Sequence, residues 1–239
     1  MPVLEVKGAH RWFGGIHAVR GVDLTVAEGE LVGLFGPNGA GKTTLFNLIA
    51  GAVPPMEGGI WLNGREVTRL AAFRRAQLGI ARTFQIVRPF RSLTVLENVM
   101  ASVPSAMAER DNDADDAMAI LRTVGLAHRA HDLAGQLTLG MLKRLEVARA
   151  LALAPCLLLL DEPLAGLTTA EISELLAVIV SLKSRTSIIM VDHNVRQSLA
   201  VCDRAVVLDS GSVIAEGTPA AVRRNPEVVR AYLGEAVTS

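Results

Sequence analysis

The sequence predicts an α/β fold with a mostly parallel sheet, and two observations carry this prediction. Short apolar runs typical of strands buried on both faces occur at Leu31–Phe35, Cys156–Leu160 and Ser187–Val191, and a segment with helical spacing follows each run. A glycine-rich stretch also separates the first run from the helical run Thr44–Ala50. Because strands and helices alternate in this way, we expect one domain over residues 1–239.

The glycine-rich stretch is a Walker A phosphate-binding loop. It consists of Gly36, Pro37, Asn38, Gly39, Ala40, Gly41, Lys42 and Thr43, and Thr44 continues it into the helix. Glycines permit positive φ and bring backbone N–H groups close to phosphate oxygens. Lys42 can reach the β and γ oxygens, the Thr43 hydroxyl can ligate Mg²⁺, and the helix N-terminus adds positive potential. We therefore expect a nucleotide polyphosphate to bind here.

Polar groups that suit hydrolysis follow the other buried strands. In an enzyme with this loop, the strand ending in a carboxylate is expected beside the loop strand, so Asp161 would hold Mg²⁺ directly or through water. Glu162 is then free to orient the attacking water. His193, at the end of a neighbouring strand, is expected to contact the γ-phosphate and couple it to Glu162. Gln85 is a further candidate for metal and water.

The first part of the chain predicts an antiparallel layer that precedes the nucleotide core. Val3–Val6 and Val22–Val26 alternate like strands around a Gly14-Gly15 turn, and Gly58–Gly64 reads as a further strand with a tight turn. Phe13 lies just before the first turn. Its ring either packs in the core or stacks on a nucleotide base, and the residues alone favour packing.

The middle of the chain predicts an inserted helical subdomain, residues 86–154, between core segments 1–85 and 155–239. Helical spacing covers Ser92–Met107 and Asp115–Val124 around the acidic stretch Glu109–Asp113, and a helix is expected from Gly140 to about Leu153. The last part alternates between helices and short strands. The expected segments are Ala170–Leu182, Asn194–Val201, Ala205–Leu208, Val213–Glu216, Pro219–Arg224 and Pro226–Leu233.

Composition argues against several classes of protein. The formal net charge is zero and no dense basic block occurs, so nucleic acid is not expected as a partner. Cys156 and Cys202 lie singly in apolar contexts, which favours buried thiols in a reducing compartment. The longest apolar stretch, Val147–Leu160, is too short and too interrupted to cross a membrane, and no signal peptide opens the chain. We expect a cytoplasmic chain.

Taken together, the motifs resemble an ABC transporter ATP-binding cassette over nearly the whole chain. The resemblance implies ATP and Mg²⁺ as cofactors. It makes Phe13 the adenine-stacking aromatic, Gln85 the Q-loop glutamine, Glu162 the catalytic base and His193 the switch histidine. It also makes Leu137–Met141, including Thr138, Leu139 and Gly140, the signature that closes on ATP bound by a second cassette in a head-to-tail dimer.

A narrower resemblance is to the ATPase subunit of branched-chain amino acid importers. It rests on four segments: residues 81–85 (ARTFQ), 93–99 (LTVLENV), 145–149 (LEVAR) and 230–235 (RAYLGE). It implies two cassettes, two transmembrane permease subunits and an external solute-binding protein. The chain would lie on the cytoplasmic face of the inner membrane, and the cargo would be a branched-chain amino acid or a small relative such as another amino acid or an amide.

The signature departs from the family pattern. Met141 and Leu142 stand where hydrogen-bonding amides are usual, so contacts to the partner's nucleotide should be weaker and a heterodimer asymmetric. Thr168 and Asn194 also replace acidic residues that are common in the family. Two alternatives stay open: a soluble ABC-type ATPase that is not coupled to transport, and a mainly regulatory nucleotide-binding half. The pairing of Glu162 with His193 argues against the regulatory half.

Overall fold

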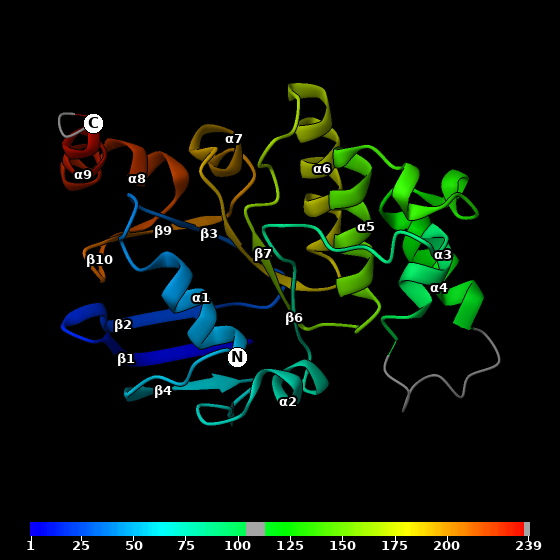
Figure 1. Cartoon of the computed structure of the whole chain (residues 1–239). Coiled ribbons are helices and arrows are strands. Elements are labelled where there is room, and N and C mark those ends of the chain that lie inside the picture. Colours follow the sequence, from blue (N-terminus) through cyan, green and yellow to red (C-terminus); the bar gives the residue numbers. More distant parts are fainter. Residues whose placement is uncertain (104–112, 237–239) are drawn as a thin grey trace.

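The structure, a computed structural model, describes residues 1–103 and 113–236. Two sheets and the helices around them form the described part of the chain (Figure 1). One sheet has the strand order β2-β1-β4-β5 and the other has the order β10-β9-β3-β8-β7-β6. The predicted α/β fold with an N-terminal antiparallel layer is therefore confirmed.

The antiparallel sheet begins as a long hairpin. Strands β1 (Leu4–Phe13) and β2 (Ile16–Val26) pair in antiparallel fashion on either side of the expected Gly14-Gly15 turn. Strand β4 (Glu57–Leu62) pairs with the other edge of β1, and β5 (Arg65–Glu66) completes the sheet. Both strands of the hairpin extend further than the sequence pattern indicated, and β2 reaches the nucleotide side of the molecule.

The second sheet is parallel from β9 to β6, and each of its three central strands is buried throughout. These strands are β3 (Leu31–Phe35), β7 (Leu157–Asp161) and β8 (Ser187–Val191). The remaining strands are β6 (Ile80–Arg82), β9 (Arg204–Asp209) and β10 (Ser212–Gly217). Only β10 runs antiparallel to its neighbour.

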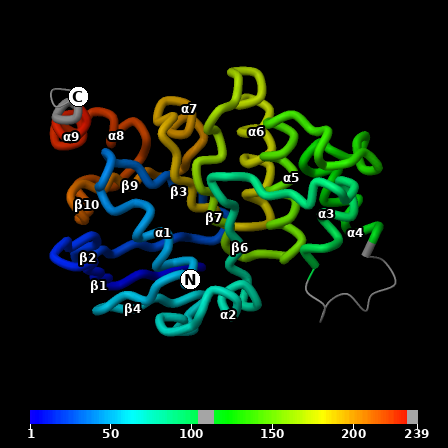
Figure 2. Tube along the Cα trace, viewed as in Figure 1, coloured from blue at the N-terminus to red at the C-terminus, as the bar shows by residue number. Residues whose placement is uncertain are grey.

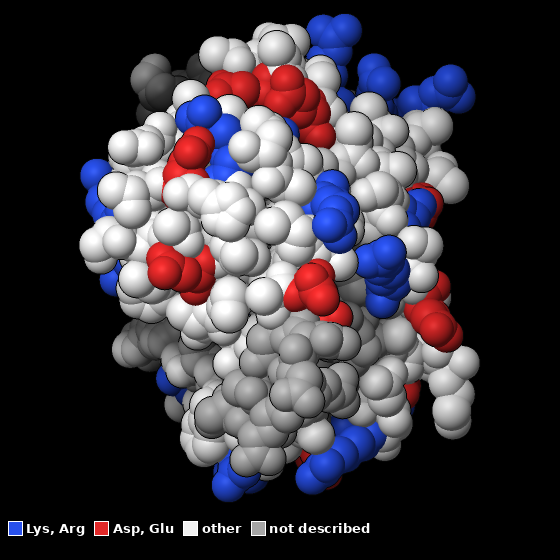
Figure 3. Space-filling model, turned by 90° about the vertical axis from the view of Figure 1, so that its right-hand side faces the viewer, with Lys and Arg blue, Asp and Glu red and all other residues white. Residues whose placement is uncertain are grey.

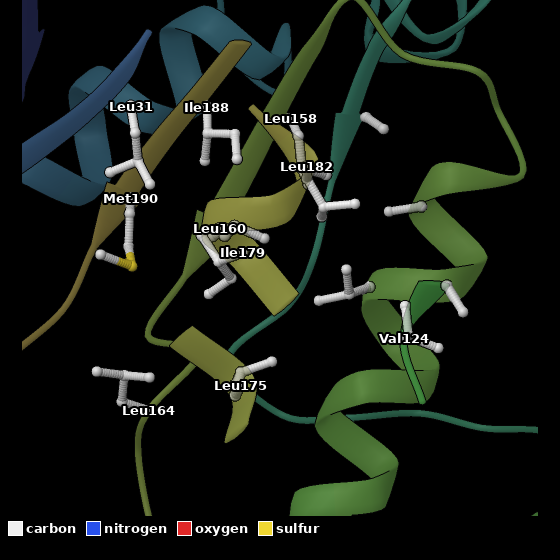
Figure 4. Close-up of a cluster of buried hydrophobic side chains, with 14 of the residues drawn as sticks. Leu31, Val124, Leu158, Leu160, Leu164, Leu175, Ile179, Leu182, Ile188 and Met190 are labelled. Carbon is white, nitrogen blue, oxygen red and sulfur yellow. The ribbon is translucent and has the colours of Figure 1, made fainter. Parts of the chain in front are cut away.

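Helices cover both faces of the parallel sheet. Helix α1 (Lys42–Ala50) lies between the two sheets and ends at Gly51, which has φ 76°. Helix α6 (Thr169–Leu182) packs on the other face, where Leu175, Ile179 and Leu182 meet apolar side chains of the sheet (Figure 4). Because helices pack on both faces of this sheet, side chains on both faces of the central strands are apolar, and the strands form continuous apolar runs in the sequence.

The strand order corrects one expectation. The Asp161 strand, β7, does not lie beside the loop strand β3, because β8 lies between them and pairs with both. Chain order does not decide this arrangement, since crossover helices allow the chain to skip a strand position and fill it later. His193, which follows β8, therefore lies nearer the loop strand than the carboxylates do, whereas its expected position beside the Asp161 strand is confirmed.

The middle of the chain is helical, with short elements. Helix α3 (Val95–Met100) begins later than the expected Ser92, because Thr94 and Glu97 form a capping box that sets its start, and it ends before Ala101. The last part of the expected helix, residues 104–107, lies outside the described residues. Helix α4 (Asp113–Thr123) and helix α5 (Leu139–Leu151) follow. Most of the acidic stretch Glu109–Asp113 lies outside the described residues. The face carrying α3 and α4 shows charges of both signs interspersed with uncharged side chains (Figure 3).

The last two helices, α8 (Pro219–Arg224) and α9 (Pro226–Ala236), lie at the end of the molecule opposite α3 and α4 (Figure 2). Helix α7 (Val195–Leu199) lies between α8 and α6 in this view. The short helix α2 (Ala72–Gln77) and two 3-10 turns, Ala127–Arg129 and Ala134–Gln136, complete the helices of the described residues. Within residues 1–103 and 113–236, none of the helices is long and apolar enough to cross a membrane.

Candidate functional site

The Walker A loop leaves β3 and enters α1 with its glycines in conformations that a side chain would strain. Gly36, Gly39 and Gly41 have φ of 143°, 76° and 100°. A Cβ on Gly36 would meet the carbonyl oxygen of Leu208 at 2.1 Å. The loop therefore requires glycine for its backbone angles and for its close approach to β9.

Lys42 is buried beneath the loop. Its Nζ donates hydrogen bonds to the carbonyl oxygens of Gly36 at 2.6 Å and Pro37 at 2.7 Å. The same side chain lines a cavity of about 340 Å³ beside the loop. Lys42 thus lies where it can exchange loop carbonyls for phosphate oxygens when a nucleotide enters.

The cavity is lined by residues from several separate parts of the chain. They include Asn38, Lys42 and Thr43 of the loop, residues 16–18 and 20 of β2, and Glu162 and His193. Phe13 is not in this lining. Its ring is 44% exposed at the end of β1, with the Arg11 guanidinium carbon 4.8 Å from the ring centroid. Core packing of Phe13, which the residues alone favoured, is therefore wrong, and its stacking on adenine stays a prediction.

Glu162 lies where the ends of β7 and β8 meet. Its backbone N–H donates to the carbonyl of Val191 at 2.8 Å, and its φ is 46°, unusual for a residue with a side chain. Gln85 Nε2 donates to Glu162 Oε2 at 2.8 Å, and His193 Nε2 lies 3.1 Å from Glu162 Oε1. The structure thus brings together Gln85, Glu162 and His193, three residues that the sequence singled out separately.

Asp161 faces a different neighbour. It is buried at the end of β7, and Arg82 Nη2 donates to its Oδ2 at 2.7 Å. The carboxylate of Asp161, the hydroxyl of Thr43 and the amide oxygen of Gln85 are hard oxygen donors of the kind that Mg²⁺ takes. The donor types therefore fit Mg²⁺; of these three residues, Thr43 lines the cavity, whereas Asp161 and Gln85 are not in its lining.

Helix α5 holds the backbone beneath these side chains through a residue that sequence reasoning missed. Lys143 Nζ donates to the carbonyl oxygens of Gln85 at 3.0 Å and Glu162 at 3.1 Å. One turn further on, Glu146 Oε1 accepts from the Phe84 N–H at 2.7 Å. Burial lowers the pKa of Lys143 and raises the pKa of Glu146. The available signal was a pair of charged residues, Lys143 and Glu146, among the otherwise apolar buried residues of this helix.

The residues of the expected signature form the start of α5. Thr138 is the N-cap, and its hydroxyl accepts from the Met141 N–H at 3.4 Å. A Cβ on Gly140 would meet Glu171 Oε1 at 2.7 Å, so a side chain at this position would require the Glu171 side chain to move. Leu139 is 41% exposed. The start of α5 is thus capped from within the chain, and its side chains beyond the cap are apolar.

Comparison with known proteins gives this site a family. Residues 19–165 match the model described as ABC transporter, and residues 212–238 match the model described as branched-chain amino acid ATP-binding cassette transporter. The chain belongs to the ABC transporter family. It is the ATP-binding cassette that the motifs and the fold predicted.

Named relatives match the cassette from end to end. It is 38% identical to the high-affinity branched-chain amino acid transport ATP-binding protein BraF of Pseudomonas aeruginosa, with 98% of this chain and 99% of that protein covered. The protein of the same description called LivG, from Escherichia coli K12, is also 38% identical with the same coverage.

Solved structures agree with the fold. The ADP conformation of MJ1267, an ATP-binding cassette of an ABC transporter, superposes with a TM-score of 0.89 at 28% identity, covering 98% of this chain and 99% of that one. A dimeric post-hydrolysis state of the cassette MJ0796, bound to ADP and Pi, superposes with a TM-score of 0.76 at 26% identity, covering 90% and 98%.

The C-terminal region touches the Walker A loop directly. The hydroxyl of Tyr232, on α9, accepts a hydrogen bond from the Gly36 N–H at 2.8 Å. Tyr232 also lines an apolar cavity of about 310 Å³ with Phe35, the residue before the loop. The segment matched by the branched-chain model therefore holds the first residue of the Walker A loop through a hydrogen bond.

Replacing Tyr232 with Phe should weaken nucleotide binding without unfolding the cassette. The substitution removes the acceptor for Gly36 and keeps the ring, so the loop loses about 1 kcal/mol of support and the Kd for ATP should rise about 2- to 10-fold. Titration with a fluorescent ATP analogue measures this change. Arg230→Ala on the same helix is the control and should leave the Kd unchanged. Equal Kd values for Tyr232→Phe and the unsubstituted cassette would contradict the support role.

Proposed function

We propose that this cassette binds and hydrolyses ATP to power an importer of branched-chain amino acids. The observation that carries the proposal is the arrangement of Glu162, which bonds Gln85 on one side and His193 on the other at the rim of a cavity lined by the Walker A loop. A site used only to hold a nucleotide has no need of a carboxylate held by these two contacts in the lining of the cavity beside the loop.

The residues divide the chemistry of hydrolysis among them. Lys42 and the loop N–H groups bind the phosphates and balance the charge that develops during phosphoryl transfer. Glu162 accepts a proton from the attacking water, while Gln85 and His193 hold its carboxylate in place. Bound Mg²⁺ supplies charge neutralisation of the β and γ oxygens, and Thr43, Asp161 and Gln85 are the side chains that would hold it. Phe13 would stack on adenine.

The cargo follows from the relatives rather than from the site. BraF and LivG are described as high-affinity branched-chain amino acid transport proteins, and a second model specific to such cassettes matches residues 212–238. We therefore assign to this chain a second cassette, two transmembrane permease subunits and an external solute-binding protein as partners. In that complex it is peripheral on the cytoplasmic face of the membrane.

Similarity to importer subunits over 98% of the chain favours transport over a soluble ATPase that is not coupled to it. The regulatory half is disfavoured by the intact group of Glu162, Gln85 and His193. Within the cassette, residues 86–154 would form the subdomain that docks on the permease loops.

Substituting Glu162 with Gln tests whether this residue is needed for ATP hydrolysis and whether amino acid uptake depends on that hydrolysis. The amide cannot accept the proton, so ATP turnover should fall by at least about 10²-fold while ATP stays bound. In cells lacking the chain, the unsubstituted gene should restore uptake of labelled leucine and the Glu162→Gln gene should not.

Glu174→Gln is the matched control for that experiment, because Glu174 is an exposed glutamate whose side chain bonds Arg144 on α5. It should retain both turnover and uptake. Undiminished hydrolysis by Glu162→Gln would refute Glu162 as the base. Lost hydrolysis with normal leucine uptake would refute the importer.

The signature makes a separate proposal about the dimer. Cassettes of this family occur in a dimeric state such as that of MJ0796, and an apolar start of α5 offers the partner's nucleotide fewer hydrogen bonds than an amide would. We expect a heterodimer in which the site facing Met141 is the weaker one.

Restoring an amide with Met141→Gln should raise the ATPase rate of the assembled complex severalfold. Steady-state phosphate release from the purified complex measures the rate. Met56→Gln, at a methionine that is 57% exposed and outside the nucleotide cavity, is the control. An unchanged ATPase rate with Met141→Gln would contradict the proposed difference between the two ATP sites.

A further inference from the structure

Arg82 connects the three parts of the nucleotide site that come from different elements. It is the last residue of β6, three positions before Gln85. Its Nη1 donates to Asn47 Oδ1 on α1 at 2.6 Å, and its Nη2 donates to Asp161 Oδ2 at the end of β7 at 2.7 Å. One guanidinium therefore joins the Walker helix, the carboxylate strand and the strand that leads to Gln85.

Two aromatic rings fix the guanidinium in this position. Its central carbon lies 5.1 Å from the centroid of Phe46, which is buried on α1, and 5.5 Å from the centroid of Phe84. The side chain of Arg82 is only 17% exposed and that of Asp161 only 12%. A planar fork that stacks on rings and donates in two directions is a property of arginine, and lysine does not share it.

The contact has two consequences for Asp161. The hydrogen bond to Oδ2 holds the carboxylate in one orientation, and the positive charge offsets part of the negative potential that a metal would experience there. Lys143 is a second cation near this group, but its Nζ bonds the carbonyls of Gln85 and Glu162 rather than the carboxylate. Arg82 is thus the cation in direct contact with Asp161.

We propose that Arg82 is a positioning residue that orients the Asp161 carboxylate and limits how strongly that carboxylate attracts Mg²⁺. This inference rests on the proposed function. Orientation and charge are separable, because a lysine retains the charge without the fork, whereas a methionine retains neither.

The test measures the Mg²⁺ concentration that half-saturates binding of a fluorescent, non-hydrolysable ATP analogue to the full-length chain. For Arg82→Met, this concentration should fall about 3- to 10-fold, because a competing positive charge has been removed. For Arg82→Lys, it should stay within about 2-fold of the unsubstituted chain. ATP turnover at saturating Mg²⁺ should fall about 10-fold in both variants, because Asp161 is no longer fixed.

Two further variants keep the test decisive. Asn47→Ala removes the other hydrogen bond of the guanidinium and should leave the Mg²⁺ dependence unchanged. Arg82→Gln supplies a neutral hydrogen-bonding side chain if the methionine variant does not fold, and it should show the same fall in half-saturating Mg²⁺. A half-saturating concentration that is unchanged or higher in the neutral variants would overturn the proposal, since a loss of structure alone weakens Mg²⁺ binding.

The experiment distinguishes a failure of the proposed transport function from a failure of the role assigned to Arg82. If the unsubstituted chain binds the analogue with Mg²⁺ but the assembled complex hydrolyses no ATP, the proposed function fails and the Mg²⁺ titration still decides the role of Arg82. If the unsubstituted complex hydrolyses ATP normally and the half-saturating Mg²⁺ concentration is unchanged in Arg82→Met and Arg82→Gln, only the role assigned to Arg82 fails.

Discussion

The carboxyl ends of parallel strands β3, β8 and β7 lie side by side, and this constraint determines the rest of the site. Parallel pairing places the Walker A loop, His193 and the Asp161-Glu162 pair at one edge of one sheet. Glu162 depends on it most closely, because its N–H bonds the carbonyl of Val191 on the neighbouring strand and its φ of 46° turns the side chain toward Gln85 and His193.

Elements outside the central strands hold the edge in place. Helix α5 reaches it through Lys143, α9 through the hydroxyl of Tyr232, and β6 through Arg82. Each contact ends on the backbone or the carboxylate of a residue proposed to bind or hydrolyse ATP. Helix α5 is therefore connected to this edge within one chain, which suits the proposal that its start acts on the ATP of a partner cassette.

Much of this could be read from the sequence, for identifiable reasons. The Walker A loop, the buried strands and the hairpin are local, since glycine spacing and apolar runs encode them directly. The position of β8 between β3 and β7 was not readable, because strand order depends on crossovers between distant segments. The start of helix α3 was predicted too early, because Thr94, which caps the helix, lies inside an apolar run. Lys143 was missed, and Arg82 and Tyr232 were noted only as part of segments typical of the family, because the partners of all three are far away in the sequence.

The most direct test of the strand-edge site is a structure of the Glu162→Gln cassette, alone or with its partner cassette, bound to ATP and Mg²⁺. The γ-phosphate should lie within hydrogen-bond distance of Lys42 and His193, with the amide at position 162 facing the attacking water. The partner's signature should close over the same phosphate in a head-to-tail dimer. A γ-phosphate bound away from the ends of β3, β7 and β8 would contradict the assignment of the site.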